Sequence, residues 1–469
     1  MLRMLGKIVF INVLALTQIW ALNTNDIQKK TKSIQNEYLQ YYEDIQSGDK
    51  AFAAGKKEKA TELYQNALSG LIQLKEKAPN WEPTIIKYRI SYVEEILSGK
   101  YRKTYDGWHY IEQNNEITIV ANETASGETV IPSEINGIPV RKVGSAWSPV
   151  FGFENTNITS VVLPESVKEI GAEAFYRQKT LKKISLSQKL TKIGRRAFED
   201  CENLAYLILP KTVDTIGMSA FGGCSKLKSI KLENGMSSIG SRWFASMTSL
   251  TAIEIPESIK RVEHGAFDGC SNLLSIKFEP GVVSIGYSAF NGCEKLQEVA
   301  FPDTVSDIGK SALANCGKLE RVKLPSNVKE IGTYENCASL KSIDIPHHVE
   351  EVREHSFYNC KALEQVLIGT QVKYIGNAAF ENCIKLKEVI VPENCTRIGA
   401  SAFTNCESLE TIKIKGKLSV GAKAFLGCKN LKEIVVSNEV GWDGSDIFQG
   451  CSKLSQADLI QIKYLKAAK

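Results

Sequence analysis

The sequence predicts a solenoid of about 13 stacked coils with short parallel strands, preceded by a small all-α helical-hairpin domain. Two observations support this prediction. A unit of 23 residues repeats from about Ile158 to Leu454, with apolar residues at fixed positions in each copy. The segment before residue 100 lacks this period and has the spacing of amphipathic helices. We therefore expect a helical domain at residues 22–100 and repeats at residues 158–455.

Residues 1–21 have the features of a secretory signal peptide. Arg3 and Lys7 supply positive charge, the apolar run Ile8–Leu16 follows, and Ala21 is a small residue at a suitable cleavage position. The run is shorter than the roughly 20 residues of a membrane span, although an uncleaved anchor is the alternative. We therefore expect a secreted or cell-surface protein, periplasmic if the source is bacterial, with no membrane span after cleavage.

Residues 22–100 are expected to form the helical domain, because Asp26–Leu97 is rich in Lys, Glu, Gln and Ala. Five residues fall in the phase of a tetratricopeptide repeat, a helix hairpin with small residues where the helices cross: Gly48, Gly55, Ala60, Tyr64 and Ala67. This resemblance covers one unit, and its closing proline is displaced to Pro79. Flanking helices near Ile27–Gln46 and Pro83–Leu97 would complete the domain, with Ser98–Lys100 as the linker.

The repeating unit is marked by an Ile-Gly pair and reads I-G-x-x-A-F-x-x-C-x-x-L-x-x-I-x-L-P-x-x-V-x-x. One unit cannot bury its apolar residues alone, so each Ile, Leu, Phe and Cys should lie against its copy in the next coil. The L-x-x-I-x-L stretch alternates as a half-buried strand does, and proline often ends it. We expect V-x-x-I-G to be a second short strand and A-F-x-x-C to be a helical turn or short helix.

Three places depart from the period. The spacing from Gly144 to Gly171 is four residues longer than the others, as expected of an N-terminal cap and first irregular repeat at residues 101–157. The unit at Gly332 lacks the Ala-Phe pair and two residues, so we expect a local kink or a pinched turn there. Residues 456–469 break the pattern and predict an amphipathic helix that caps the last coil.

The repeated units resemble the BspA-like, Treponema-type leucine-rich repeats over about two-thirds of the chain. The lead-in segments Ile117–Val120 and Thr129–Val140 resemble the start of the repeat region in the same family. The resemblance implies a leucine-rich-repeat solenoid. It also implies export, and adhesion to host proteins, matrix or other cells.

Eleven of the 12 cysteines occupy one slot of the unit, and Cys395 takes a slot where other units carry Val. This placement indicates compact core residues. Metal ligands would have to converge, which one Cys per coil does not allow. Disulfides between coils are the alternative, because coils about 4.8 Å apart fall within the Cα range for such a bond. Parallel side chains keep the Cβ atoms slightly too far apart, so we favour free thiols.

No pattern supports catalysis, a metal site or a cofactor. His347, His348 and His355 lack a metal-binding spacing and are interpreted as surface turn residues. No phosphate-binding glycine loop and no nucleophile elbow occur in the sequence. The net charge of +5 is small for 469 residues and gives no support to a nucleic-acid partner. We therefore predict no enzymatic activity, no cofactor and no nucleic-acid binding.

The candidate ligand contacts lie at positions that the core does not dictate. Within L-x-x-I-x-L, the residue between Ile and Leu points outward, and so does the residue two before it; both columns vary from coil to coil. Variable residues on a fixed scaffold suit recognition, although drift on an inert surface gives the same pattern. The charged residues selected from these columns are Lys231, Glu254, Lys277, Arg321, Lys323, Asp344 and Lys413.

The predicted function rests on the family resemblance. We expect an exported, non-enzymatic binding or adhesion protein that presents an extended solenoid surface to a protein or extracellular-matrix ligand. The alternative is a structural spacer or scaffold that holds the helical domain. A hydrolase with an unrecognised site is a more distant alternative, which no motif supports.

Overall fold

The computed structural model describes residues 25–53, 56–79, 86, 89–90, 93–94, 97, 103–122, 124–144, 156–232, 235–442 and 445–455. The expected signal peptide, the linker at Ser98–Lys100 and the C-terminal capping helix lie outside these residues. Contacts divide the chain into two compact units between Arg102 and Lys103. The first unit is helical and the second is a β-solenoid.

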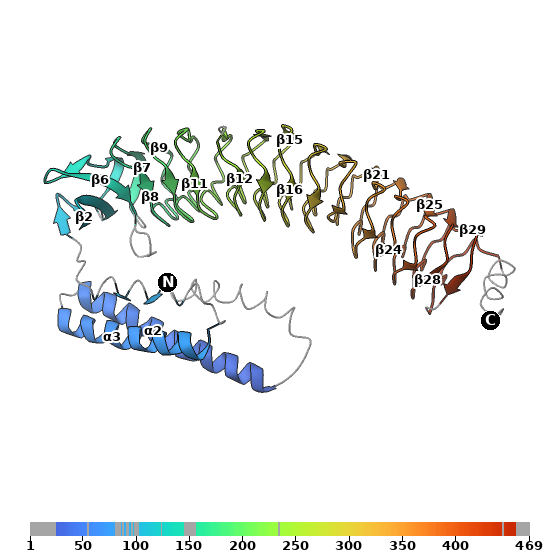
Figure 1. The fold of residues 1–469 in the computed structure, drawn as a ribbon, viewed down its shortest axis with the longest axis horizontal. Helices are drawn as coiled ribbons and strands as arrows, with labels where there is room; N and C mark the ends of the chain where they lie inside the picture. Colours follow the sequence, from blue (N-terminus) through green and yellow to red (C-terminus); the bar gives the residue numbers. More distant parts are fainter. Residues whose placement is uncertain are drawn as a thin grey trace. The chain divides into compact units, whose positions relative to one another are not determined.

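The helical unit contains α2 (Asn25–Ala53) and α3 (Lys57–Lys77), which pack side by side (Figure 1). A Cβ atom on Gly48 would lie 2.8 Å from the Tyr64 ring, so the glycine makes room for an aromatic side chain of the other helix. Two more small residues of the expected hairpin are buried: Ala60 and Ala67. Gly55 lies outside the described residues. Among the described helices, none is both long enough and apolar enough to span a bilayer.

The solenoid begins with antiparallel strands. β1 (Lys103–Tyr105), β2 (Trp108–Gln113) and β3 (Glu116–Ala121) form an antiparallel meander, and β5 (Glu134–Ile135) pairs antiparallel with β6 (Ile138–Val143). β3 then pairs in parallel with β6, which is the first strand of the repeating type. The meander thus covers the edge of the parallel stack, where unpaired backbone groups would otherwise be exposed.

Each coil contributes up to two short strands, which form two faces of the solenoid (Figure 1). The first strand face consists of β4 (Ser126–Val130), β7 (Asn157–Val162), β9 (Lys183–Ser185), β13 (Ala252–Ile255), β15 (Ser275–Phe278), β17 (Glu298–Ala300), β19 (Arg321–Lys323), β21 (Ser342–Asp344), β23 (Gln365–Leu367), β25 (Glu388–Val391), β27 (Thr411–Ile414) and β29 (Glu433–Val436). Where neighbouring strands pair, they pair in parallel and one unit apart, as in Ile253 opposite Ile276. β15 and β17, β19 and β21, and β23 and β25 are not paired.

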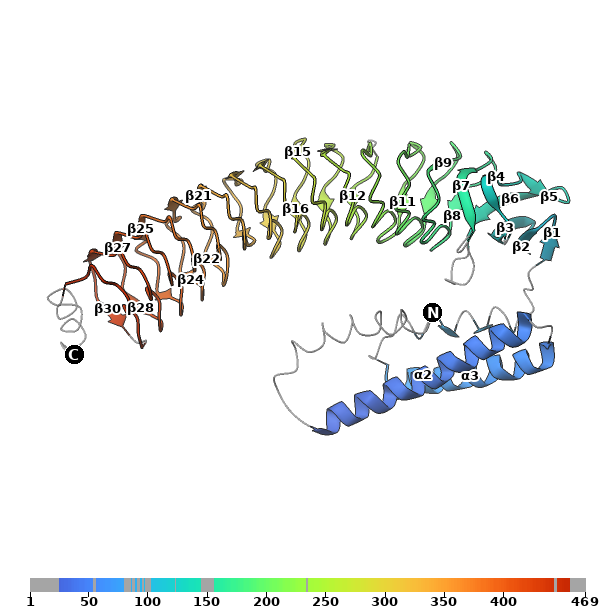
Figure 2. The ribbon, with the colours of Figure 1, turned by 180° about the vertical axis from the view of Figure 1, so that it is seen from behind.

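The second strand face consists, after β6, of β8 (Glu169–Ile170), β10 (Lys192–Ile193), β11 (Thr215–Ile216), β12 (Ser238–Ile239), β14 (Arg261–Val262), β16 (Ser284–Ile285), β18 (Asp307–Ile308), β20 (Glu330–Ile331), β22 (Glu351–Val352), β24 (Tyr374–Ile375), β26 (Arg397–Ile398), β28 (Leu418–Val420) and β30 (Val440–Trp442). The described residues therefore hold 14 strands of this type, counting β6. The predicted parallel-strand solenoid of about 13 coils is confirmed, and its coils form one curved row (Figure 2).

Between the faces, each core side chain stacks on its copy in the next coil. The rings of Phe357, Phe380 and Phe403 lie parallel, with centroids 5.1 and 5.2 Å apart. All 12 cysteines are buried free thiols. The ladder thiols donate hydrogen bonds to carbonyls of the preceding coil, as Cys383 Sγ does to Phe357 O at 3.2 Å. The core is thus a set of parallel ladders, in which Cys is a small apolar residue with a weak donor.

The A-F-x-x-C segment forms consecutive turns on a third side of the coil, which we call the turn face. The residues before Ala and before Cys have left-handed backbones, with φ of 57° at Arg196 and 60° at Asp200. Left-handed residues interrupt a right-handed helix, so the expected short helix does not form. The backbone N–H groups instead donate to the next coil, as Phe175 does to Ala197 O at 2.8 Å.

An asparagine ladder runs along the turn face. The left-handed residue before Cys is Asn in five successive coils: Asn315, Asn336, Asn359, Asn382 and Asn405. Each side-chain amide from Asn336 onward donates to Oδ1 of the Asn in the preceding coil, at 2.8 to 3.0 Å. Asn tolerates the left-handed backbone better than most residues and can also satisfy its neighbour. The ladder therefore locks these coils in register.

The coil at Gly332 carries the expected irregularity. Two residues are missing between Gly332 and the aromatic slot, where Tyr334 replaces Phe and stacks on Phe357 with centroids 5.4 Å apart. Gly332 has φ of 70°, so the turn is pinched. The second strand face is interrupted there, because one sheet ends at β20 and the next begins at β22. The same face has one other interruption in the described residues, between β11 and β12.

Candidate functional site

The shortened coil opens a discontinuity that we call the seam, with β19 and β20 on one side and β21 and β22 on the other. At the start of β19 and β21 the coils still touch, because Lys341 N–H donates to Glu320 O at 3.2 Å. Farther along, no backbone hydrogen bond among the described residues joins Lys323 or Leu324 to Asp344 or Ile345. The two strands therefore diverge toward their ends.

The cause is the missing turn. In regular coils the left-handed residue before Ala donates its N–H to a carbonyl of the next coil, as Ser288 does to Lys310 O at 3.1 Å. Ser311 instead donates to the side-chain Oγ1 of Thr333, at 3.1 Å. The asparagine ladder and the Tyr334 ring keep their register across this coil. The contacts of the turn face keep their register although the coil is two residues shorter. The two strand faces must therefore adjust to the shorter coil.

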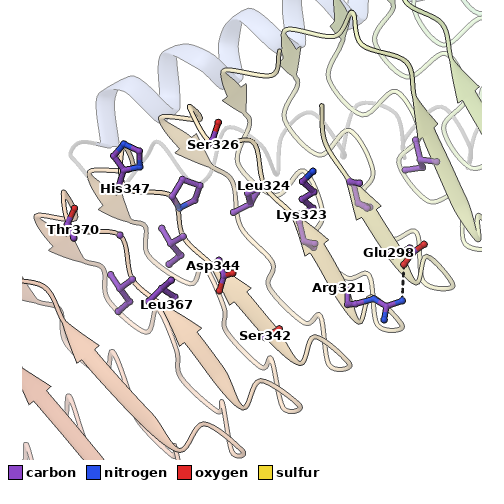
Figure 3. Close-up of a pocket in the computed structure, with 18 of the residues that line it drawn as sticks. Glu298, Arg321, Lys323, Leu324, Ser326, Ser342, Asp344, His347, Leu367 and Thr370 are labelled. Atoms are coloured by element: carbon purple, nitrogen blue, oxygen red, sulfur yellow. Dashed lines mark hydrogen bonds and ion pairs between the residues drawn. The ribbon is translucent and has the colours of Figure 1, made fainter. Parts of the chain in front are cut away.

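A hollow of about 910 Å³ lies on the first strand face over the seam. Its lining includes Arg321, Lys323, Asp344, His347 and Leu367 (Figure 3). This volume is within the roughly 300–1,000 Å³ of ligand pockets, although the hollow is open rather than enclosed. The hollow over the seam thus brings together exposed side chains of both charges.

A smaller hollow of about 470 Å³ lies over the seam on the second strand face. Glu330, Glu351 and Arg353 line it. Arg353 Nη2 lies 2.5 Å from Glu330 Oε2, so an ion pair between neighbouring coils spans this opening. The charges here are partly satisfied by the fold itself, as Arg321 and Glu298 are in the first hollow.

The seven predicted contact residues all lie on the first strand face, but the hollow brings only some of them together. Arg321, Lys323 and Asp344 line it. The other four lie along the same face outside the hollow: Lys231, Glu254, Lys277 and Lys413. Lys413 is half-buried, and the other six are exposed. The hollow thus singles out three residues from the middle of the predicted column.

Several charges on this face pair with one another across neighbouring coils. Lys277 Nζ lies 2.8 Å from Glu254 Oε1, and Arg321 Nη2 lies 3.0 Å from Glu298 Oε2. The hydrogen bond from Lys277 lowers the pKa of the Glu254 carboxyl. Such exposed pairs contribute little to stability. They nevertheless reduce the number of charges on this face that are available to a ligand.

The histidines lie at the corner between the two hollows. His347 lines the first hollow and His348 the second, with ring centroids 3.9 Å apart. Both are exposed, as expected of surface turn residues, and His355 lies elsewhere beside Tyr358. In the described part of the chain, no group of three or more His, Cys, Asp or Glu side chains is placed to hold a metal ion.

Hydroxyl, imidazole and carboxylate groups all line the first hollow. Among the described residues, however, no hydrogen bond joins His347 to Ser326, Ser342 or Asp344. A nucleophile needs a general base within hydrogen-bond reach, so this geometry gives a hydrolase no support. The Cys270 thiol is equally unsuited to act as a nucleophile, because burial raises its pKa to about 12.

Two features were missed at the level of sequence. The asparagine ladder has a sequence signal, the recurrent Asn-Cys pair from Asn315 to Cys406. The hollow has a weaker signal, the two-residue deletion after Gly332, which indicated a local irregularity but not which face would open. Neither feature follows from the period, because both depend on contacts between neighbouring coils.

The comparisons with known proteins agree with this architecture. The family profile described as BspA type leucine-rich repeat region, in six copies, matches residues 149–274, 238–360 and 332–455. These ranges together span well over half of the chain. No curated protein matches the sequence significantly.

Among solved structures, a leucine-rich repeat protein from Bacteroides ovatus matches with a TM-score of 0.59 and 23% identity, over 78% of this chain and 97% of its own. A leucine-rich cell surface protein from Faecalibacterium prausnitzii matches with a TM-score of 0.44 and 23% identity, over 72% and 95%. The pneumococcal vaccine antigen PcpA matches with a TM-score of 0.46 and 20% identity, over 72% and 99%. At these identities the first match supports the fold alone.

Proposed function

Because the chain belongs to the BspA-type leucine-rich-repeat family, we propose that it is an exported, non-enzymatic binding protein. Its ligand is a protein held on the first strand face, and the hollow at the seam is the centre of the contact. One observation carries the proposal: the hollow of about 910 Å³ coincides with three of the predicted contacts, Arg321, Lys323 and Asp344. The signal-like residues 1–21 place this work outside the cell or at its surface.

The physical argument is that the fold does not need these side chains. Lys323 and Asp344 are exposed and take part in no ion pair among the described residues. The ladders beneath them keep the coils together whatever the outward positions carry. Exposed charges that stability does not require are free to serve recognition. Side chains on neighbouring coils also form a continuous surface, which suits a macromolecular ligand.

The test uses the mature chain, residues 22–469, and a panel of purified extracellular-matrix proteins in biolayer interferometry. We expect at least one of them to bind, and Lys323→Glu and Asp344→Lys each to weaken that binding about fivefold or more. Lys310→Glu is the matched control, because Lys310 is exposed on the turn face and carries the same charge. Equal binding by the native chain and the three variants would mean that the ligand does not contact the hollow.

A structural spacer remains the second candidate, favoured by the division of the chain into a helical unit and a separate solenoid. A spacer needs the length of the solenoid but not its surface chemistry. The spacer hypothesis therefore predicts that no matrix protein binds the solenoid alone, residues 103–469. Any binding would then belong to the helical unit. Binding by the solenoid fragment that depends on Lys323 would contradict the spacer.

A further inference from the structure

Lys323 and Asp344 are opposite charges that the seam leaves apart. Elsewhere on the first strand face, opposite charges on hydrogen-bonded strands pair across coils, as Lys277 with Glu254 at 2.8 Å and Lys413 with Glu388 at 2.5 Å. Lys323 and Asp344 hold equivalent positions on neighbouring strands, but β19 and β21 are not paired, as β15 and β17 and also β23 and β25 are not. Figure 3 shows the Lys323 side chain extended away from the Asp344 carboxylate, with no interaction drawn between them.

An apolar side chain continues the row. Leu367 holds the same column position on β23 and is 63% exposed. Beneath the row, the floor of the hollow includes Leu324 and Ile345, which are largely buried. Successive coils therefore present a cation, an anion and an aliphatic group in order along the solenoid. Regular strands lie about 4.8 Å apart, and the divergence of β19 and β21 widens the step between the two charges.

The mixed charge narrows the class of ligand. A polyanion such as a nucleic acid or a sulfated glycan would meet Lys323 favourably but would be repelled by Asp344 and Glu298, which line the same hollow. A polycation meets the converse problem at Lys323 and Arg321. An extended peptide can present acidic, basic and apolar side chains in turn. Its side chains on one face recur about every 6.8 Å, so successive ones can reach successive coils.

Resting on the function proposed above, we propose that the hollow binds an extended peptide segment that runs along the coils. The segment carries the order acidic, any, basic, any, apolar. Its acidic side chain pairs with Lys323, its basic side chain with Asp344, and its apolar side chain packs on Leu367. The charged side chains of the ligand thus form ion pairs with Lys323 and Asp344, which form none with other described residues.

The probe is a pair of fluorescein-labelled peptides on a Gly-Ser background, one with Glu-Ser-Lys-Ser-Leu and one with Lys-Ser-Glu-Ser-Leu. Fluorescence anisotropy with the mature chain should show the first peptide binding about tenfold more tightly than the second. The double variant Lys323→Glu with Asp344→Lys should reverse that preference. An unchanged preference in the double variant, or equal binding of the two peptides by the native chain, would overturn the proposal.

A second variant tests the role of the seam. Insertion of Ala-Ser after Thr333 restores the 23-residue spacing and should bring Asp344 opposite Lys323, so that the two side chains pair with each other. We expect a native circular dichroism spectrum and a loss of peptide affinity of about tenfold. Full affinity in this folded variant would place the peptide elsewhere. If matrix proteins bind through Lys323 while the two peptides bind with equal affinity, the proposed function stands and this inference fails.

Discussion

The regular stack from β22 to β28 and the shortened coil at Gly332 share one core but differ at the surface. In the regular stack the Phe357, Phe380 and Phe403 rings, the cysteine and asparagine ladders and the second strand face all continue from coil to coil. At the shortened coil the asparagine ladder continues and Tyr334 stacks on Phe357 of the next coil, but the second strand face is interrupted. The ladders therefore hold the coils together, and the strand faces can vary independently of them.

A two-residue deletion in a turn can open a hollow on a strand face while the asparagine ladder continues through the shortened coil. The turn face fixes the distance between coils through short, directional hydrogen bonds. The strands are held by fewer bonds at this point and take up the misfit. Variation in turn length is therefore a route to new surface features in a stack whose core stays constant.

The largest expected effect is on the regular stack. Phe380→Ala leaves a cavity between Phe357 and Phe403, with ring centroids 5.1 and 5.2 Å away. We expect the free energy of unfolding to fall by about 3–5 kcal/mol, measured by urea denaturation followed by circular dichroism. If the loss were under about 1 kcal/mol, the aromatic ladder would not be the main support of the stack, and the contrast with the seam would weaken.

The next effect concerns how closely the coils approach on the second strand face. A Cβ atom on Gly399 would lie 2.6 Å from the backbone of Asn377 and Gly376. Gly399→Ala should therefore cost about 1–3 kcal/mol of unfolding free energy, because the two backbones must move apart. Gly317→Ala is the control, since a Cβ atom there meets nothing within 4 Å. Equal stability of the two variants would show that coil spacing is looser than the structure indicates.

The asparagine ladder should contribute less than the aromatic one. Asn359 has φ of 60° and accepts a hydrogen bond from Asn382 at 2.8 Å. Asn359→Ala should lower the free energy of unfolding by about 1–2 kcal/mol, from the left-handed backbone and the lost hydrogen bonds. Asn359→Gly allows the left-handed backbone and removes only the hydrogen bonds, so its free energy of unfolding should fall by less than that of Asn359→Ala. The same loss in both variants would mean that the backbone conformation contributes nothing.

The smallest expected effect is a gain at the shortened coil. The Tyr334 hydroxyl is buried and has no hydrogen-bond partner among the described residues. Tyr334→Phe removes an unsatisfied polar group from the core, so the free energy of unfolding should rise by about 1 kcal/mol. Tyr287→Phe is the control, because Tyr287 is 52% exposed. A loss of stability in Tyr334→Phe would mean that the hydroxyl has a hydrogen-bond partner and stabilises the shortened coil.

The period was enough to predict the solenoid, because each apolar residue of the unit needs its copy in the next coil. The outward column from Lys231 to Lys413 followed from the alternation of the first strand. A helical turn or short helix was predicted at A-F-x-x-C, where the structure has consecutive turns with left-handed residues. Its sequence signal was available, since Gly or Asn before Cys recurs through the chain.

The candidate site could be predicted only in part. The columns identified Arg321, Lys323 and Asp344 among seven charged residues, and nothing in the sequence distinguished these three from the others. What distinguishes them is the pairing of strands, which depends on how a shortened turn distributes its misfit around a whole coil. That distribution is a property of the stack and cannot be read from any single unit.

The asparagine ladder also has a mechanical consequence. A rod under load bends where its cross-section carries fewest bonds, and at the seam the turn face keeps its hydrogen bonds while the second strand face lacks them. The turn face thus acts as the pivot, and opening or closing of the strand faces becomes the easiest bending motion of the solenoid. A ligand that bridges Lys323 and Asp344 would stiffen this joint, so the curvature of the solenoid and occupancy of the hollow would be linked.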